Sequence, residues 1–219
     1  SLLWAYATMG IINEQLFSSF IPVTAKLIHS CDNEGLANIA WAYAVADVDA
    51  PTLFNHYFIN VWIEKKDKIM NESDLRKLHQ WHLWQTREKS RAGLPRALQD
   101  RCYKAFISSV PSPSKLQDDV IHQLSTLGLE PRKEVTLDTS GYLIDAVVKV
   151  NGKTIGVEVD GPSHFIGKSK SPLARTILKR RQVPLVDGIE LVSLSYWEWK
   201  RHGNDPEMKQ KYLRKMLRL

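Results

Sequence analysis

Apolar positions in the first 65 residues follow a helical spacing, and the spacing repeats along the chain. The tetrapeptide Trp-Ala-Tyr-Ala occurs at positions 4–7 and 41–44, and the pair Leu-Phe occurs at 16–17 and 53–54, in each case 37 residues later. Phe20 and Tyr57 stand at the same offset. A fixed period of this length is typical of stacked helical pairs that bury their apolar faces against one another. The pattern therefore predicts an α-solenoid with its aromatic residues in the core; stacking of these aromatics on nucleic-acid bases is the alternative.

A third, less regular helical pair is expected between Asn71 and Val110. Asn71 or Ser73 can cap its first helix, and a stretch rich in arginine and lysine follows. We interpret the interleaved histidines and tryptophans at positions 79, 81, 82 and 84 as packing residues. The sequence Val110-Pro-Ser-Pro-Ser114 then breaks the helical spacing. We expect a domain boundary there, with a helical-repeat region over 1–110 and a second domain over 112–219.

In the second domain, short apolar runs alternate with helical segments. Helices are expected over 116–127, over 171–181 and from Asp205 onward, and Gly128 suits the end of the first one. Strands are expected over 129–135, 142–150, 153–160 and 189–195. The resulting order, α-β-β-β-α-β-α, predicts a small α/β domain. The fold class of the whole chain is therefore mixed, with an α-solenoid followed by an α/β domain.

Asn151-Gly152 is a strong signal for a two-residue hairpin turn. If these residues form the turn, Val150 pairs with Lys153, and Asp145 stands opposite Glu158. Side chains alternate along strands, so Asp145, Glu158 and Asp160 share one face. The other face is expected to be apolar core: Ile144, Ala146, Val148, Val150, Ile155, Val157 and Val159.

Two carboxylates directly opposite each other on neighbouring strands repel one another. A divalent cation bound by Asp145 and Glu158 would offset the repulsion, as would a nearby lysine or arginine or a proton shared between the two groups. A salt-bridged acidic patch, with Lys149 and residues 179–181 as partners, is the alternative to a metal site. The sequence leaves these readings open.

Charge changes the picture because it is unevenly distributed. The chain carries a net charge of +6, yet residues 1–60 hold one basic and five acidic residues, whereas residues 61–219 hold 29 basic and 19 acidic ones. Such asymmetry favours a polyanion-binding face on the later part. The strongest cationic run has no acidic residue within it and can contact phosphates: Lys168, Lys170, Arg175, Lys179, Arg180 and Arg181.

Composition excludes several other classes. The two cysteines, Cys31 and Cys102, are far apart and match no zinc-ligand spacing, so neither a disulfide framework nor a zinc module is indicated. No apolar run is long enough for a membrane span, and no membrane partner is expected. The opening SLLWAYA reads as the middle of an apolar helix, so we expect a piece of a longer protein whose targeting signal lies upstream.

The second domain resembles a RAP domain. The resemblance covers about residues 112–219 and rests on Asp145, on the run Glu158-Val-Asp-Gly-Pro-Ser-His164, on the helix ending at Gln182, and on Leu194-Ser-Tyr-Trp-Glu-Trp199. The preceding repeat is similar to heptatricopeptide and octatricopeptide arrays. The resemblance implies a restriction-endonuclease-like fold and a role in mitochondrial or plastid RNA processing, stability or translation. We expect Trp197 and Trp199 to anchor packing, with base stacking as the alternative.

In the wider nuclease superfamily, which the resemblance implies, an Asp and an Asp/Glu-x-Lys motif hold magnesium and activate water. Asp145 and Glu158 match the two acids, but Asp160 stands where lysine is expected. His164 is a substitute general base or, alternatively, a hydrogen-bonded turn residue. Catalytic roles for Asp145, Glu158, Asp160 and His164, with magnesium on the first two, are thus expected only if the domain is active.

Our leading hypothesis is an RNA-binding organellar factor that needs no cofactor for binding. Its expected partners are ribosomal RNA or organellar transcripts, together with ribosomal proteins, and no DNA partner is expected. We expect it in the mitochondrion, including the mitochondrial ribosome, with the plastid as the alternative location. The competing hypotheses are a magnesium-dependent endoribonuclease and a purely protein-binding scaffold.

Overall fold

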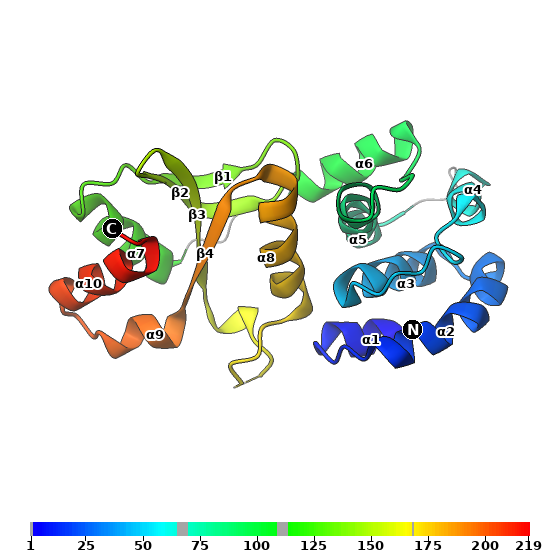
Figure 1. Ribbon diagram of the computed structural model, residues 1–219, viewed down its shortest axis with the longest axis horizontal. Coiled ribbons are helices and arrows are strands. Elements are labelled where there is room, and N and C mark those ends of the chain that lie inside the picture. The colour runs from blue at the N-terminus through cyan, green and yellow to red at the C-terminus, as the bar shows by residue number, and fades with distance from the viewer. Residues whose placement is uncertain (1, 65–69, 109–113, 168) are drawn as a thin grey trace. The chain divides into compact units, whose positions relative to one another are not determined.

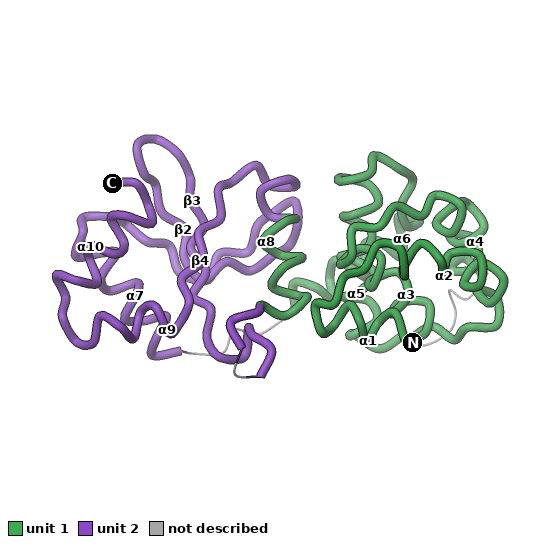
Figure 2. The backbone as a smooth tube through the Cα atoms, turned by 60° about the horizontal axis from the view of Figure 1, so that its bottom comes forward, with its two compact units in different colours: residues 1–109, 172–182 green, residues 110–171, 183–219 purple. Residues whose placement is uncertain are grey.

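The computed structural model describes residues 2–64, 70–108, 114–167 and 169–219. The chain divides into two compact units, which Figure 2 distinguishes by colour. Unit 1 comprises residues 1–109 and 172–182, and unit 2 comprises residues 110–171 and 183–219. The expected mixed class, a helical region followed by a small α/β region, is confirmed. The boundary predicted at Val110–Ser114 falls largely on residues outside the described ranges and stays a prediction.

Unit 1 is built from helices that follow one another along the chain (Figure 1). A one-turn 3₁₀ segment, η1 (Ile28–Ser30), follows α2, and a π-helical turn, η2 (Trp84–Glu88), continues α5. The α-helices are α1 (Leu2–Thr8), α2 (Glu14–Leu27), α3 (Asn33–Ala46), α4 (His56–Glu64), α5 (Glu72–Leu83) and α6 (Arg96–Ile107), together with the first part of α8 (Ala174–Asp187).

The two predicted repeats differ at the start of their second helix. Asn13 caps α2, because its side-chain oxygen accepts from the backbone N–H of Leu16 at 2.8 Å. The equivalent residue 37 positions later is Ala50, which has no side-chain acceptor and so cannot cap a helix. Helix α4 accordingly begins only after Asn55, whose side-chain oxygen accepts from the N–H of Tyr57. The Leu53-Phe54 pair therefore lies in a turn, although its counterpart at 16–17 is helical.

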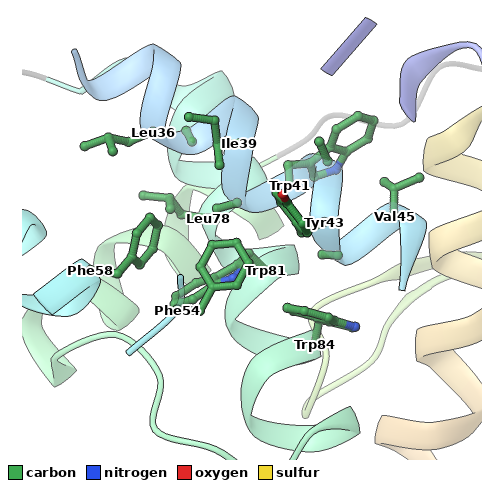
Figure 3. Close-up of a cluster of buried hydrophobic side chains, with 14 of the residues drawn as sticks. Leu36, Ile39, Trp41, Tyr43, Val45, Phe54, Phe58, Leu78, Trp81 and Trp84 are labelled. Carbon is green, nitrogen blue, oxygen red and sulfur yellow. The ribbon is translucent and has the colours of Figure 1, made fainter. Parts of the chain in front are cut away.

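Aromatic side chains form the core of unit 1, as the repeat predicts (Figure 3). The Tyr43 ring makes edge contacts with Phe17 at 5.5 Å and with Phe54 at 5.4 Å between centroids. Its buried hydroxyl donates to the carbonyl of Phe17, and burial raises the pKa of Tyr43 to about 12. Phe54 also packs against Trp81 and Trp84. These contacts confirm a packing role for most of the repeat aromatics.

The third helical pair also forms, and Asn71 rather than Ser73 caps it. The Asn71 side-chain oxygen accepts from the N–H of Asp74 at 2.8 Å. His79 and His82 are buried, which confirms their expected packing role. The Nδ1 atom of His82 accepts from the backbone N–H of Leu94. An acceptor at Nδ1 requires the neutral ring, so this contact orders the 89–95 connection only while His82 is uncharged.

Unit 2 contains a four-stranded mixed sheet in the order β1-β2-β3-β4 (Figure 1). The first three strands are antiparallel neighbours, and β4 runs parallel to β3. A parallel pair needs a crossover connection, and residues 161–189, which include α8, provide it. The elements are α7 (Lys115–Thr126), β1 (Arg132–Thr136), β2 (Leu143–Val150), β3 (Lys153–Asp160), η3 (Pro162–His164), β4 (Glu190–Ser195), α9 (Tyr196–Arg201) and α10 (Pro206–Leu217).

The predicted hairpin register is confirmed from Val150 opposite Lys153 to Ala146 opposite Val157. The pair predicted next, Asp145 opposite Glu158, is not part of this ladder, because the Asp145 side chain accepts from the backbone N–H of Val159. Asn151 and Gly152 both have positive φ, at 50° and 79°, as a type I′ turn requires. Six of the seven residues predicted for the apolar face contribute to the core beneath α7, α9 and α10, namely Ala146, Val148, Val150, Ile155, Val157 and Val159.

Ile144, the seventh residue predicted for that face, is fully buried but lies elsewhere. Its Cγ2 is 3.2 Å from the position that a Cβ on Gly156 would occupy, beside Leu191 and Ile189. The alternation that places Ile144 with Ala146 is thus interrupted at Asp145. The side chain of Asp145 binds the backbone of β3, as described below, so the strand departs there from a regular pleat.

Helix α8 is longer than expected, because it continues through Pro184 to Asp187. Sequence reasoning ends helices before proline, since the ring removes an N–H donor. Residues up to Gln182 group with unit 1 and residues from Val183 group with unit 2. One helix is therefore shared by the two units. Helix α9 was not predicted at all, although Ser195 before it is a suitable helix start.

Among the described residues, no helix has the length and apolarity that crossing a membrane would require.

Candidate nucleic-acid interface

The carboxyl ends of β3 and β4 meet at one edge of the sheet. The two strands are parallel and in register, with Glu158 beside Ser193 and Asp160 beside Ser195. The chain therefore leaves this edge twice, once into η3 and once into α9. In open α/β sheets, ligands commonly bind outside the carboxyl ends of parallel strands. Most of the residues that the sequence selects in unit 2 lie on these two strands or just after them.

Asp145 uses its carboxylate to bind the neighbouring strand. Its Oδ2 accepts from the backbone N–H of Val159 at 2.7 Å. The Gln117 side chain of α7 donates to the backbone carbonyl of Asp145. A carboxylate that accepts a backbone N–H is stabilised in its charged form without any metal. Asp145 thus has a structural role at the point where β2 and β3 diverge.

Glu158 and Asp160 are nearly inaccessible to solvent, with 3% and 1% of their surfaces exposed. The Oδ1 atom of Asp160 lies 2.9 Å from Nδ1 of His164, which follows it in η3. The His164 side chain remains one-third exposed. A carboxylate at Nδ1 fixes the orientation of the imidazole ring, and this contact fits the hydrogen-bonded turn residue that we expected as one of two roles. The catalytic roles of all four residues stay predictions.

The residues at this edge do not fit a ready magnesium site. One oxygen of Asp145 is engaged by a backbone N–H, and Asp160 is engaged by His164. Over the described part of the chain, no three His, Cys, Asp or Glu side chains are grouped so that they could hold a metal ion. Magnesium usually binds through one or two carboxylates with several waters, and buried acids offer such a hydrated ion little room. We therefore derive no reaction step through a metal.

Aromatic and basic side chains gather at the same edge and form what we call the aromatic-basic cluster. Trp197 contacts Phe165 at 4.4 Å and Tyr196 at 5.2 Å between ring centroids. The ammonium group of Lys170 lies 5.7 Å from the Trp197 ring, and that of Lys200 lies 5.5 Å from the Tyr196 ring. Tyr196 and Trp197 are half-exposed, whereas both lysines are exposed. The cluster combines flat aromatic surface with exposed positive charge.

Hydrogen bonds hold α9, and with it the rings of the cluster, in place. The Ser195 hydroxyl donates to Glu198 at 2.6 Å, and the Tyr212 hydroxyl of α10 donates to the same carboxylate at 3.1 Å. The Ser195 bond is the main cause that lowers the pKa of Glu198, so this carboxylate stays charged at neutral pH. Trp199 is buried and donates to Asp119 of α7 at 2.8 Å, which confirms that it anchors packing.

The cations predicted to contact RNA differ in their exposure and in their contacts. Lys168 lies outside the described residues. Lys170 belongs to the aromatic-basic cluster, and Arg175 is exposed in the first turn of α8. Lys179 and Arg180 are half-buried. Arg181 is held inside unit 1 by Glu88, with 23% of its side chain exposed.

Sequence reasoning gave no binding role to Phe165, Tyr196 or Lys200, and it gave Trp197 mainly a packing role. Their signal lies in the topology. Once β3 and β4 are known to be parallel neighbours, the residues after Asp160 and after Ser195 must meet at one edge. The sequence shows only two segments more than 30 positions apart, Phe165 and the Tyr196-Trp197 pair, with no local motif that links them.

Comparison with known protein families assigns this region. Residues 157–216, from the middle of β3 to the last helix, match the model of the RAP domain. This part of the chain is a RAP domain. A rice protein (Oryza sativa subsp. japonica) described as "RAP domain-containing protein, chloroplastic" is 31% identical over 201 residues, which cover 83% of this chain and 29% of the rice protein. The chain thus spans less than a third of that relative. The aromatic-basic cluster and the Asp160–His164 pair all fall inside the RAP domain.

Proposed function

We propose that this protein binds single-stranded RNA through the aromatic-basic cluster of its RAP domain. The observation that carries the proposal is the position of the Lys170 and Lys200 ammonium groups within 6 Å of the half-exposed rings of Trp197 and Tyr196. Single-stranded nucleic acid is typically bound by aromatic rings on which bases stack and by cations that follow the phosphates. The cluster offers both on one edge of the sheet.

The positive charge of the later part of the chain supports the same assignment. Residues 61–219 hold 29 basic and 19 acidic residues, so an approaching polyanion is attracted over a broad surface. Arg175, which belongs to unit 1, is a further exposed cation of the later part of the chain. Phosphate contacts of this kind fix position without reading sequence, so sequence preference would come from the rings and their surroundings.

We place the protein in organellar RNA metabolism. The support is its RAP domain together with its similarity to a rice protein whose name includes "chloroplastic". Within that proposal, the mitochondrion and the plastid are both consistent with the chain. We propose two classes of RNA as partners. One is ribosomal RNA, bound within an organellar ribosome beside ribosomal proteins, and the other is organellar transcripts.

The test is RNA binding by wild-type protein and by variants of the cluster, measured by fluorescence anisotropy with a labelled ten-nucleotide RNA. Trp197→Ala should weaken binding about tenfold, because base–aromatic stacking contributes ~1–3 kcal/mol per base. The double variant Lys170→Gln/Lys200→Gln should reduce the slope of log affinity against log salt by about 1.4, since each phosphate contact on a single strand contributes ~0.7.

Lys153→Gln is the matched control, because Lys153 is an exposed cation at the hairpin end of β3, the opposite end from the cluster. It should change affinity less than the double lysine variant does. Wild-type protein that shows no RNA affinity at 50 mM salt would overturn the proposal. If a variant with all three cluster substitutions binds RNA as tightly as the wild type, the interface lies elsewhere on the molecule.

A further inference from the structure

The segment between η3 and α8 is a loop whose backbone is hydrogen-bonded to itself. The N–H of Ile166 donates to the carbonyl of Ser171 at 2.9 Å, and the N–H of Ser169 donates to the carbonyl of Ile166 at 2.9 Å. Ser169, Lys170 and Ser171 are nevertheless exposed. The loop carries Lys170 of the aromatic-basic cluster, so a chemical change in the loop acts directly on the cluster.

The two serines of the loop differ in what their hydroxyl groups do. The Ser169 hydroxyl oxygen accepts from the backbone N–H of Ser171 at 3.1 Å. Among the hydrogen bonds formed by the described residues, none involves the Ser171 hydroxyl. The conformation of the loop therefore depends on the Ser169 oxygen and not on the exposed Ser171 oxygen, which is accessible to a reagent from solution.

Pro172 follows Ser171 directly and makes this serine the stronger candidate for phosphorylation. A residue before proline is held in an extended conformation, which is the form in which protein kinases bind their substrates. Proline also lacks an N–H. A Ser-Pro pair therefore suits proline-directed kinases, whose substrate groove makes no hydrogen bond to the residue after the serine. Ser169 precedes Lys170 and lacks this feature.

A phosphate on Ser171 would change the charge of the cluster. A phosphoserine carries ~1.5–2 negative charges and three acceptor oxygens. The neighbouring Lys170 holds its ammonium group 5.7 Å from the Trp197 ring, an arrangement that suits an RNA phosphate beside a stacked base. The new anion would pair with this ammonium group and repel the RNA phosphate. The first effect removes attraction and the second adds repulsion, so both weaken RNA binding.

From these observations we propose that Ser171 is a phosphorylation site for a proline-directed kinase and that its phosphate releases RNA from the aromatic-basic cluster. In the reaction, the Ser171 hydroxyl oxygen forms a bond to the γ-phosphorus of ATP. The bond from that phosphorus to the oxygen bridging it to the β-phosphate breaks, ADP leaves, and the hydroxyl proton passes to the catalytic aspartate of the kinase. The release of RNA rests on the proposed function, whereas the modification itself does not.

The first experiment tests the modification on the folded full chain. It uses Ser112→Ala protein, because Ser112-Pro113 is another Ser-Pro pair of the sequence. A proline-directed kinase with ATP should add a phosphate that peptide mass spectrometry locates on Ser171. Ser171→Ala and Pro172→Ala should each remove it, whereas Ser169→Ala, the matched control in the same loop, should retain it. Absence of phosphate from Ser171, or phosphorylation that persists after Pro172→Ala, overturns the site.

The second experiment measures the effect on RNA without any kinase. Phosphoserine is incorporated in place of Ser171 by codon reassignment, and affinity for the ten-nucleotide RNA is measured by anisotropy. Binding should be about tenfold weaker than that of the wild type at 50 mM salt, and the difference should shrink as the salt concentration rises. Phosphoserine in place of Ser125 is the matched control, because Ser125 is exposed and lines a pocket with Lys149 and Thr154 at the hairpin end of the sheet. It should weaken binding by no more than about twofold.

The role of Lys170 in the release is tested in Lys170→Gln protein. There the same phosphate should weaken binding less, because the ammonium group that it neutralises is gone. Circular dichroism melts establish that each protein is folded. If the wild type binds RNA and phosphoserine in place of Ser171 leaves the affinity unchanged, the release of RNA is overturned and the proposed function stands. Absence of wild-type RNA binding overturns the proposed function and the release of RNA with it, but not the modification of Ser171.

Discussion

The guanidinium Nε of Arg181 lies 2.8 Å from Oε2 of Glu88, a residue 93 positions earlier in the chain. The same guanidinium donates to the carbonyls of Ala44 and Val45 in the last turn of α3, where a cation is favoured by the helix dipole. Gln182, the next residue, donates to the other oxygen of Glu88 at 3.0 Å. An arginine that the sequence placed in the RNA-binding run therefore fixes the first part of α8, up to Gln182, within unit 1.

We predict that Arg181→Gln destabilises the protein without weakening RNA binding by the folded molecule. Only 5% of the Glu88 side chain is exposed, so removing the arginine leaves a buried carboxylate without a cation. Loss of one member costs ~3–5 kcal/mol for a fully buried pair and about 2–4 kcal/mol here, because Arg181 is partly exposed and Gln182 still donates to Glu88. The thermal midpoint should fall by several degrees. The double variant Arg181→Gln/Glu88→Gln should lose less stability than the two single variants summed. Additive losses would contradict a direct coupling.

We predict that His82 makes stability pH-dependent in the acid range. Burial, together with the charges of His79 and Arg87, lowers the pKa of His82 to about 4 from its ordinary 6.5. Between these two values the unfolded chain binds a proton that the folded protein does not. Stability is therefore complete above about pH 6.5 and falls as the pH drops toward 4, by up to about 3 kcal/mol.

The measurement is the thermal midpoint at pH 7.5 and at pH 5 for wild type and for His82→Gln, which cannot be protonated. Carboxylates titrate in both proteins, so the difference between the two isolates the histidine. The midpoint of His82→Gln should fall less on acidification than that of the wild type. Equal falls would assign the acid sensitivity to other groups.

We predict that Gly93→Ala destabilises unit 1 through His82. A Cβ at Gly93 would lie 2.2 Å from Nδ1 of His82 and 2.6 Å from Cγ2 of Thr86, so the imidazole must move and release the N–H of Leu94. We expect a loss of about 2–3 kcal/mol, measured by urea unfolding. Gly161→Ala is the control, because Gly161 has φ −72° and no atom lies within 4 Å of its virtual Cβ. A Gly93→Ala variant as stable as this control would refute the close contact.

Removal of divalent cations should leave binding of single-stranded RNA unchanged within about twofold. The reason is geometric: Asp145 is engaged by the N–H of Val159 and Asp160 by His164, and the described residues contain no group of three His, Cys, Asp or Glu side chains that could hold a metal. The measurement is anisotropy with the ten-nucleotide RNA in EDTA and in magnesium. Magnesium-dependent cleavage that is lost in Asp145→Asn/Glu158→Gln would instead support the endoribonuclease hypothesis.

Local signals predicted most of the fold of unit 2. Asn151-Gly152 determines the turn type, and the turn determines the hairpin register, so the face that carries Glu158 and Asp160 followed from two residues. The repeat likewise predicted the aromatic core of unit 1. What could not be predicted depends on tertiary context. Pro184 is accommodated inside α8, and Ile144 leaves its expected face.

The candidate site was less predictable than the fold, because its parts are far apart in the sequence. Lys170 was selected only as one of several cations, Trp197 mainly as a packing residue and Phe165 not at all. Only the parallel pairing of β3 with β4 brings the three together. The differing positions of the predicted RNA-binding cations could not be predicted for another reason. A run of cations looks uniform in sequence, yet the helix turns one member toward Glu88 and another, Arg175, toward solvent.

The division of α8 between the two units limits which fragments of the protein can be expressed as folded domains. A fragment that starts near residue 112 takes Ala174, Leu178 and Gln182 away from the helices that bury them. The isolated fragment would then expose the apolar side chains of Ala174 and Leu178, which favours aggregation, while the isolated repeat fragment would lose the hydrogen bond from Gln182 to the carbonyl of Gln80. Engineers who exchange RAP modules between proteins would accordingly transplant the preceding helical repeats with them.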